Sequence, residues 1–230
     1  MLIDRNPLPD GLDERLRRQL AFVAEVDQLK TVLRASPLAA AERRENDAEH
    51  SWHLALMVLL LAEYADEPID VGHTMRLVIV HDLVEIYAGD SPVFDPAAVV
   101  GQREREEAAA DRLFTLLPDD QAADLRALWD EFEAGRTPEA RFGKAMDRLE
   151  PMLLNWLTGG GTWHMPGATE STVRAREAGV VAGSTSLGAA TSRLVEEGVR
   201  RGWIRPDAPG KADGQARGHH GYTQPHQHTR

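Results

Sequence analysis

Apolar residues recur along this chain at the three- and four-residue intervals of amphipathic helices, and segments that alternate in the manner of a strand are nearly absent. Leu16, Leu20 and Val23 fall on one face of a helix predicted over residues 12–32. The pattern as a whole predicts an all-α fold.

The next two predicted helices are strongly apolar. Residues 48–65 are apolar nearly all round after Trp52, which is typical of a helix buried at the centre of a domain rather than one at the surface. Residues 71–87 form the third predicted helix, which ends before Gly89. We therefore expect these two helices to build the core.

Helix-start and helix-stop residues divide the rest of the chain. A capping residue followed by proline predicts a helix start, and glycine predicts a helix end. These rules predict a loop over residues 34–45, helices over residues 95–117, 118–135 and 137–157, a break at residues 159–161, and one or two helices between residues 169 and 201.

The length and composition indicate one folded domain. The chain has 230 residues, 42% of them hydrophobic and 27% charged, as is ordinary for a soluble globular protein with one core. We expect a single helical domain over residues 1–205. Residues 206–230 are rich in glycine, proline and histidine, and their composition predicts a disordered tail without a preorganised metal site.

Charge and hydropathy limit the partners and the location. The formal net charge of −11 argues against binding to polymeric nucleic acid, which requires a basic surface. A small anionic substrate would need local positive charge. The apolar stretch at residues 54–62 is well short of the roughly 20 residues that a membrane span needs, so no membrane partner is expected. Without cysteine or a secretory signal pattern, the chain is expected to be cytoplasmic.

The adjacent pair His81 and Asp82 interrupts the apolar run MRLVIVHDLVEI. A buried carboxylate beside an imidazole needs a compensating charge, and a divalent cation that both groups can ligate would supply it. His50 and Asp147 lie on two other predicted helices and could complete a set of two nitrogens and two oxygens. Glu85 follows His81 by four residues, which would place it on the same helix face.

This ligand set suits an octahedral divalent metal such as Mn, Co, Fe or Ni better than Zn or Mg. Taken alone, each residue has a simpler interpretation. His50 could be a hydrogen-bonded structural histidine, and Asp147 could form a surface ion pair. Glu45, Asn46 and Glu49 could position His50 or could only begin its helix. The complete ordered set favours the metal site.

Three segments that carry these residues, RRENDAEHSW, HDLVEIYAGD and AMDRLEPMLLNW, resemble the HD-domain metal-dependent phosphohydrolase superfamily. They are most similar to the subgroup that contains bacterial 5'-deoxynucleotidases and eukaryotic HD-domain relatives, over about residues 29–163. The resemblance implies a helical bundle with a metal site between its central helices. It also implies a homodimer.

The resemblance assigns a role to each residue of the site. The implied metal ligands are His50, His81, Asp82 and Asp147. Glu85 would activate or orient the attacking water, Asp90 would assist near the phosphate, and Arg34 would contact the phosphate. Some members of the subgroup place a tryptophan directly after that arginine, where it helps to reject ribose. This chain has Ala35 there, so a deoxyribose preference is not carried over.

The sequence thus predicts a metal-dependent phosphohydrolase that cleaves the phosphomonoester of a small nucleotide, with a (deoxy)nucleoside 5'-monophosphate as the first choice. One alternative is a phosphatase or pyrophosphohydrolase of another phosphorylated metabolite. Another is a noncatalytic helical module whose metal is structural. A di-iron oxygenase is disfavoured because the chain has no histidine between His81 and Asp147.

Overall fold

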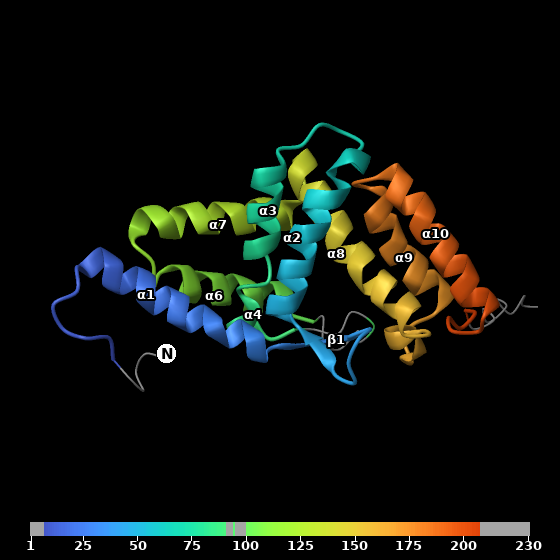
Figure 1. Cartoon of the computed structure of the whole chain (residues 1–230), viewed down its shortest axis with the longest axis horizontal. Helices are drawn as coiled ribbons and strands as arrows, with labels where there is room; N and C mark the ends of the chain where they lie inside the picture. Colours follow the sequence, from blue (N-terminus) through green and yellow to red (C-terminus); the bar gives the residue numbers. More distant parts are fainter. Residues whose placement is uncertain (1–6, 91–93, 95–99, 208–230) are drawn as a thin grey trace, which may run out of the picture.

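The computed structural model describes residues 7–90, 94 and 100–207. Most of these residues are helical (Figure 1), which confirms the predicted fold class. The α-helices are α1 (Glu14–Val26), α2 (Asp47–Leu61), α3 (Val71–Val80), α4 (Glu85–Ala88), α6 (Gln102–Phe114), α7 (Asp119–Ala134), α8 (Pro138–Leu157), α9 (Glu170–Val181) and α10 (Thr185–Arg200). Short 3-10 helices are η2 (Asp27–Thr31), η3 (Ala62–Tyr64) and η4 (Gly161–His164), and the strands are β1 (Leu33–Pro37) and β2 (Arg44–Asn46).

Helices α2, α3 and α8 form the centre of the molecule. Helix α7 packs on α3 and α8 from one side, and α9 and α10 cover α8 from the other (Figure 1). Leu54 of α2, Leu77 of α3, and Phe142 and Met146 of α8 are fully buried in the same apolar core. This central trio carries the residues that the sequence predicts to bind metal.

Capping residues determine where the helices begin and end. Asn46 accepts a hydrogen bond from the Glu49 N–H while the Glu49 carboxylate accepts one from the Asn46 N–H, which forms a capping box at the start of α2. Thr137 caps α8 and Pro138 occupies its first position. Helix α7 ends at Gly135, whose φ of 59° lies in the left-handed region. The predicted boundary at Gly135 is confirmed.

The predicted third helix is not continuous. Helix α3 ends at Val80, and residues 81–84 form a turn before α4. In this turn the Glu85 N–H donates to the Asp82 carbonyl oxygen at 3.0 Å, which is the i to i+3 spacing of a 3-10 helix. Side chains at i and i+3 eclipse in that geometry, so Glu85 lies beside Asp82. The prediction that Glu85 shares a helix face with His81 is therefore wrong.

The predicted loop over residues 34–45 contains a hairpin. Strand β1 pairs antiparallel with β2, and Leu33 lies opposite Asn46. The strands have only five and three residues, which is too short for an alternating pattern to stand out. The helix predicted from residue 95 begins at Gln102 in the described chain, and residues 95–99 lie outside it.

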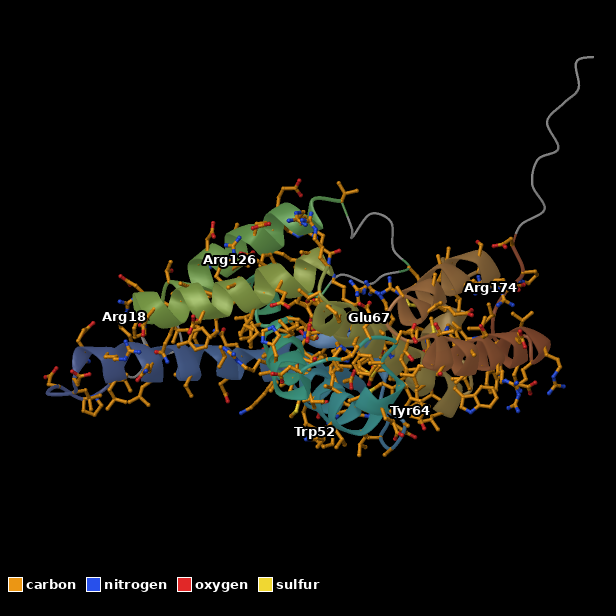
Figure 2. All side chains as sticks on the ribbon, turned by 90° about the horizontal axis from the view of Figure 1, so that it is seen from above. Arg18, Trp52, Tyr64, Glu67, Arg126 and Arg174 are labelled. Carbon is orange, nitrogen blue, oxygen red and sulfur yellow. The ribbon has the colours of Figure 1, made fainter. Side chains whose placement is uncertain are left out.

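One face of α2 lies at the surface, so the prediction of a helix buried all round is wrong. The exposed fractions are 66% for Trp52, 57% for Leu59 and 62% for Leu60, and Leu56 is exposed on the same stripe. Figure 2 shows Trp52 and Tyr64 along one edge of the molecule. An apolar helix can bury one face in its own core and offer the other to a partner.

The C-terminal helices enclose a second group of buried apolar side chains. Trp163, Val173, Val195 and Ile204 belong to it. The described chain runs to Asp207, so almost all of the predicted tail lies outside the described residues. Among the helices that the structure describes, none combines the length and the apolar character needed to cross a membrane.

Candidate metal centre

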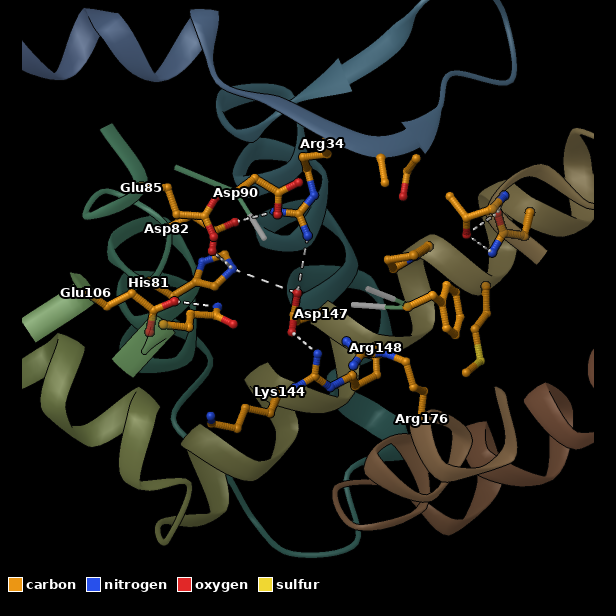
Figure 3. A pocket seen from close by; sticks show the side chains of 18 of the residues that line it. Arg34, His81, Asp82, Glu85, Asp90, Glu106, Lys144, Asp147, Arg148 and Arg176 are labelled. Carbon is orange, nitrogen blue, oxygen red and sulfur yellow. Dashed lines mark hydrogen bonds and ion pairs between the residues drawn. The ribbon is translucent and has the colours of Figure 1, made fainter. Parts of the chain in front are cut away.

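Four of the predicted residues converge from three elements. His50 lies on α2, His81 and Asp82 follow α3, and Asp147 lies on α8. His50 Nε2 is 3.2 Å from Asp147 Oδ1, and His81 Nε2 is 3.9 Å from the same oxygen. Metal-ligand bonds of about 2.0–2.2 Å place the donor atoms of one ion roughly 3–4 Å apart. The spacing of His50, His81 and Asp147 therefore fits a single cation. Asp82 Oδ1 lies 3.0 Å from His81 Nε2, at the edge of this group (Figure 3).

One ring nitrogen of His81 is available to a metal. The Nδ1–H donates to the Val78 carbonyl oxygen at 2.8 Å, which turns Nε2 toward the cluster. Nε2 is buried without a hydrogen-bond partner, although Asp82 Oδ1 lies 3.0 Å away. A cation bound by both atoms would give each of them a partner.

The carboxylates of the cluster remain ionised at neutral pH. Burial alone would raise the pKa of Asp82, but His81 and Arg34 lower it to about 2. Burial would likewise raise the pKa of Asp147, and Arg148 and His50 hold it well below its ordinary value. Both groups can therefore offer negatively charged oxygens to a cation.

The other face of His50 is surrounded by negative charge. Its Nδ1 lies 3.4 Å from Glu150 Oε2 and 3.6 Å from Glu45 Oε2, which favours a proton on Nδ1 and a lone pair on Nε2. His53 Nδ1 contacts Glu150 Oε1 at 3.1 Å. Burial would raise the pKa of Glu150, but His50 and His53 lower it to about 2. At the start of α2, Glu45 lies against His50, whereas Asn46 caps the helix.

Arg34 extends from β1 into the carboxylates of the cluster. Its Nη1 donates to Asp82 Oδ2 at 2.8 Å and to Asp47 Oδ1 at 3.2 Å, and its Nη2 lies 3.8 Å from Asp147 Oδ1. Burial would lower the pKa of Arg34, but Asp82 and Asp147 raise it well above its ordinary value. Arg34 is a permanent positive charge in this acidic centre.

Glu85 and Asp90 line the same cavity as His81 and Asp82 (Figure 3). Burial, with the charges of Asp82 and Asp47, raises the pKa of Glu85 to about 12. Burial also raises the pKa of Asp90, against the lowering effect of Arg34. Positive charge near Asp82 would lower the pKa of Glu85 and allow it to accept a proton.

Comparison with known families agrees with this geometry. Residues 26–187, well over half of the chain, match the model of the HD domain. The chain belongs to the HD-domain family. The resemblance seen in the sequence motifs is confirmed.

Several HD-domain proteins are similar to this chain. A protein of Magnetospirillum magnetotacticum MS-1, named a predicted metal-dependent phosphohydrolase, is 52% identical with a TM-score of 0.80, over 84% of this chain and 96% of that one. The 5'-deoxynucleotidase HDDC2 of Xenopus laevis is 33% identical over 58% of this chain and 66% of the frog protein. Human HDDC2 is 32% identical over 60% of this chain and 66% of its own length. The matched region spans just under two thirds of these animal relatives.

The cavity of the HD domain extends from the metal ligands toward α8 and α9. Lys144 and Arg148 of α8 and Arg176 of α9 line this part of the cavity (Figure 3). With Arg34 they place four cationic side chains among the acidic residues of the lining. A small anionic group could bind here despite the acidic surface.

Sequence reasoning missed several residues of the site. Glu150 lies three residues after Asp147 in the apolar run DRLEPML, and this spacing on one helix face could have identified it. Asp47 could have been found as an acidic first-turn residue one turn before His50. Arg176 has no comparable signal, because only the packing of α9 on α8 brings it to the cavity.

Proposed function

We propose that this HD-domain protein is a metal-dependent phosphohydrolase that cleaves the phosphomonoester of a small nucleotide, with (deoxy)nucleoside 5'-monophosphates as the first class of substrate. The observation that carries the proposal is the convergence of His50, His81 and Asp147, with Asp82 in contact with His81, beside a cavity that also contains arginines. The names of the animal relatives support a phosphomonoester substrate.

The metal ligands in this proposal are the two imidazoles and the two carboxylates of the cluster. A divalent cation held there would lower the pKa of a bound water molecule and withdraw negative charge from a phosphoryl oxygen. Two nitrogen and two oxygen donors favour Mn, Co, Fe or Ni over Zn or Mg. Burial and Arg34 would lower the pKa of His50, but Asp147 and Glu150 raise it well above its ordinary value. Protons therefore compete with the metal for His50, and metal binding weakens as the pH falls.

The remaining residues act on the water and the phosphate. Glu85, beside Asp82, accepts a proton from the attacking water or orients it. Asp90 lies on the same cavity and assists near the phosphate. Arg34 lines the cavity and contributes positive charge, while its contacts with Asp82 and Asp47 fix the orientation of these carboxylates.

A second candidate is the hydrolysis of another phosphorylated metabolite or of a pyrophosphate. Ala35 lines the cavity next to Arg34, so this wall has a small side chain and leaves room for substrates other than deoxynucleotides. The additional cations of α8 and α9 suit a substrate with more than one anionic group.

A phosphate-release screen tests both candidates. The purified protein is incubated with dAMP, dTMP, ribonucleotides, sugar phosphates and pyrophosphate in the presence of Mn, Co, Mg or Zn, with Asp82→Ala as the control. Release of phosphate from the nucleoside monophosphates supports the first candidate. Activity only on the other substrates supports the second. Inactivity on all of them, with metal removal unfolding the protein, indicates a noncatalytic module with a structural metal.

We propose in addition that the protein is a cytoplasmic homodimer. The exposed apolar stripe of α2, with Trp52, Leu59 and Leu60, supports an interface with a second copy, because such a stripe is unfavourable in water. The cytoplasmic location is consistent with the absence of cysteine from the sequence.

A further inference from the structure

Arg176 differs from the other arginines of the cavity. It projects from α9 toward Arg148 and Asp147 (Figure 3), and its side chain is half-buried on the cavity wall. It forms no hydrogen bond and no ion pair with any residue that the structure describes. A guanidinium partly removed from water is ordinarily paired with a carboxylate or with hydrogen-bond acceptors, because loss of its hydration is unfavourable.

The other two arginines are already engaged. Arg34 contacts Asp82 and Asp47 through Nη1 and approaches Asp147 through Nη2. Arg148 Nη1 lies 3.3 Å from Asp147 Oδ2. Arg34 directs both of its terminal nitrogens at carboxylates of the protein, whereas Arg148 uses only Nη1 in this way. Arg176 retains its full set of donors on the wall of the same cavity.

The surroundings of Arg176 favour an anion. Burial and the charge of Arg148 lower the pKa of Arg176 to about 10. An anion bound between these two arginines would reverse that effect and would satisfy the donors of Arg176. Asp147 lies between the two arginines and the histidines of the metal site. Its Oδ1 faces His50 and its Oδ2 faces Arg148. An anion there would be a close neighbour of the metal site.

We propose that Arg176, with Arg148 beside it, binds the phosphoryl group of the substrate, and that Arg34 mainly orients the carboxylates. The planar fork of Arg176 offers paired donors to two phosphoryl oxygens that do not take part in the ester bond. That the bound anion is the scissile phosphate of the substrate rests on the proposed function. That Arg176 belongs to an anion-binding site does not depend on the proposed function.

The test compares Arg176→Ala and Arg176→Lys with Arg174→Ala in the metal-loaded protein. Arg174 lies on the same helix but pairs with Glu170 and does not line the cavity, so it is a matched control. We expect Arg176→Ala to raise KM and the inhibition constant of inorganic phosphate by about 10- to 100-fold. Arg176→Lys should recover part of this loss, because it keeps the charge but not the fork. Arg174→Ala should leave both constants unchanged.

Two further readouts separate this inference from the proposed function and from a folding defect. Calorimetric titration with inorganic phosphate measures anion binding even if no substrate is hydrolysed, and loss of that binding in Arg176→Ala alone supports the anion site. Because Arg176 has no partner among the described residues, Arg176→Ala should not lower the thermal midpoint of unfolding. Equal phosphate binding and equal KM in Arg176→Ala and Arg174→Ala would overturn the inference.

Discussion

His81 Nε2 lies 3.0 Å from Asp82 Oδ1, although the two residues are adjacent in the chain and both are buried. The Nδ1–H of His81 donates to the Val78 carbonyl oxygen, so Nε2 is the nitrogen that meets the carboxylate. A nitrogen and a carboxylate oxygen at this distance can ligate the same cation.

Asp82→Ala should abolish metal binding at the centre. The variant removes one of the four proposed ligands and the main partner of Arg34. Loss of an outer partner of a metal ligand lowers affinity by about 10- to 100-fold, so loss of a ligand should lower it by at least about 100-fold. Metal content after dialysis, measured by mass spectrometry, gives the result. Exposed Asp111→Ala is the control, and full metal retention by Asp82→Ala would contradict the ligand assignment.

Glu150→Gln should weaken metal binding without unfolding the protein. The amide has the size of the carboxylate but lacks the negative charge that favours a proton on His50 Nδ1. We expect metal affinity to fall by about 10- to 100-fold. Competition with a chromophoric chelator measures it. The exposed Glu196→Gln variant should match the wild type, and an unchanged affinity in Glu150→Gln would exclude a positioning role.

Glu85→Gln should stabilise the metal-free protein while it lowers kcat. The folded-state pKa of Glu85 is raised from 4.5 to about 12, so between these values the folded protein binds more protons than the unfolded chain. The free energy of unfolding contributed by this group therefore falls as the pH rises above 4.5.

The increase in the free energy of unfolding from Glu85→Gln should thus be larger at pH 8 than at pH 5. We expect at least about 1 kcal/mol at pH 8, or about 2–4 °C in the thermal midpoint. Loss of a general base should lower kcat by about 10²- to 10⁴-fold. Calorimetry with chelator and steady-state kinetics with metal provide the two measurements. A variant with the kcat of the wild type would exclude Glu85 as the general base.

Trp52→Glu and Leu60→Glu should convert the proposed dimer to monomers. Both residues lie on the exposed stripe of α2, where a charge would be unfavourable in an interface. Sedimentation equilibrium should give the 25.4 kDa monomer for the variants and twice that mass for the wild type. Leu157→Glu, an exposed apolar position on α8, is the control. A monomeric wild type would refute the interface.

The sequence was sufficient for the fold class and for the residues that meet at the centre. His50, His81 and Asp147 could be placed on apolar helices from periodicity, and buried polar residues on separate apolar helices have few places to meet other than the core. The exposed face of α2 could not be predicted, because an apolar stripe has the same pattern whether it packs in a core or against a partner.

The place of Arg176 in the cavity could not be predicted from the sequence. It depends on how α9 packs on α8, and nothing in the local sequence around residue 176 distinguishes it from Arg174 two residues earlier. Glu45 and Glu150 are intermediate cases. Glu150 stands in an apolar run and Glu45 at a helix entry, which indicates a role for each, but only the fold identifies their common partner as His50.

The turn at residues 81–84 determines which pairs of side chains can cooperate. In an α-helix the interval between His81 and Glu85 would bring those two together, but the i to i+3 turn makes the interval of three between Asp82 and Glu85 the functional one. Substitutions at Leu83 or Val84 that extend α3 by one turn would therefore rotate Glu85, the proposed proton acceptor, away from Asp82 without changing the identity of any residue of the site.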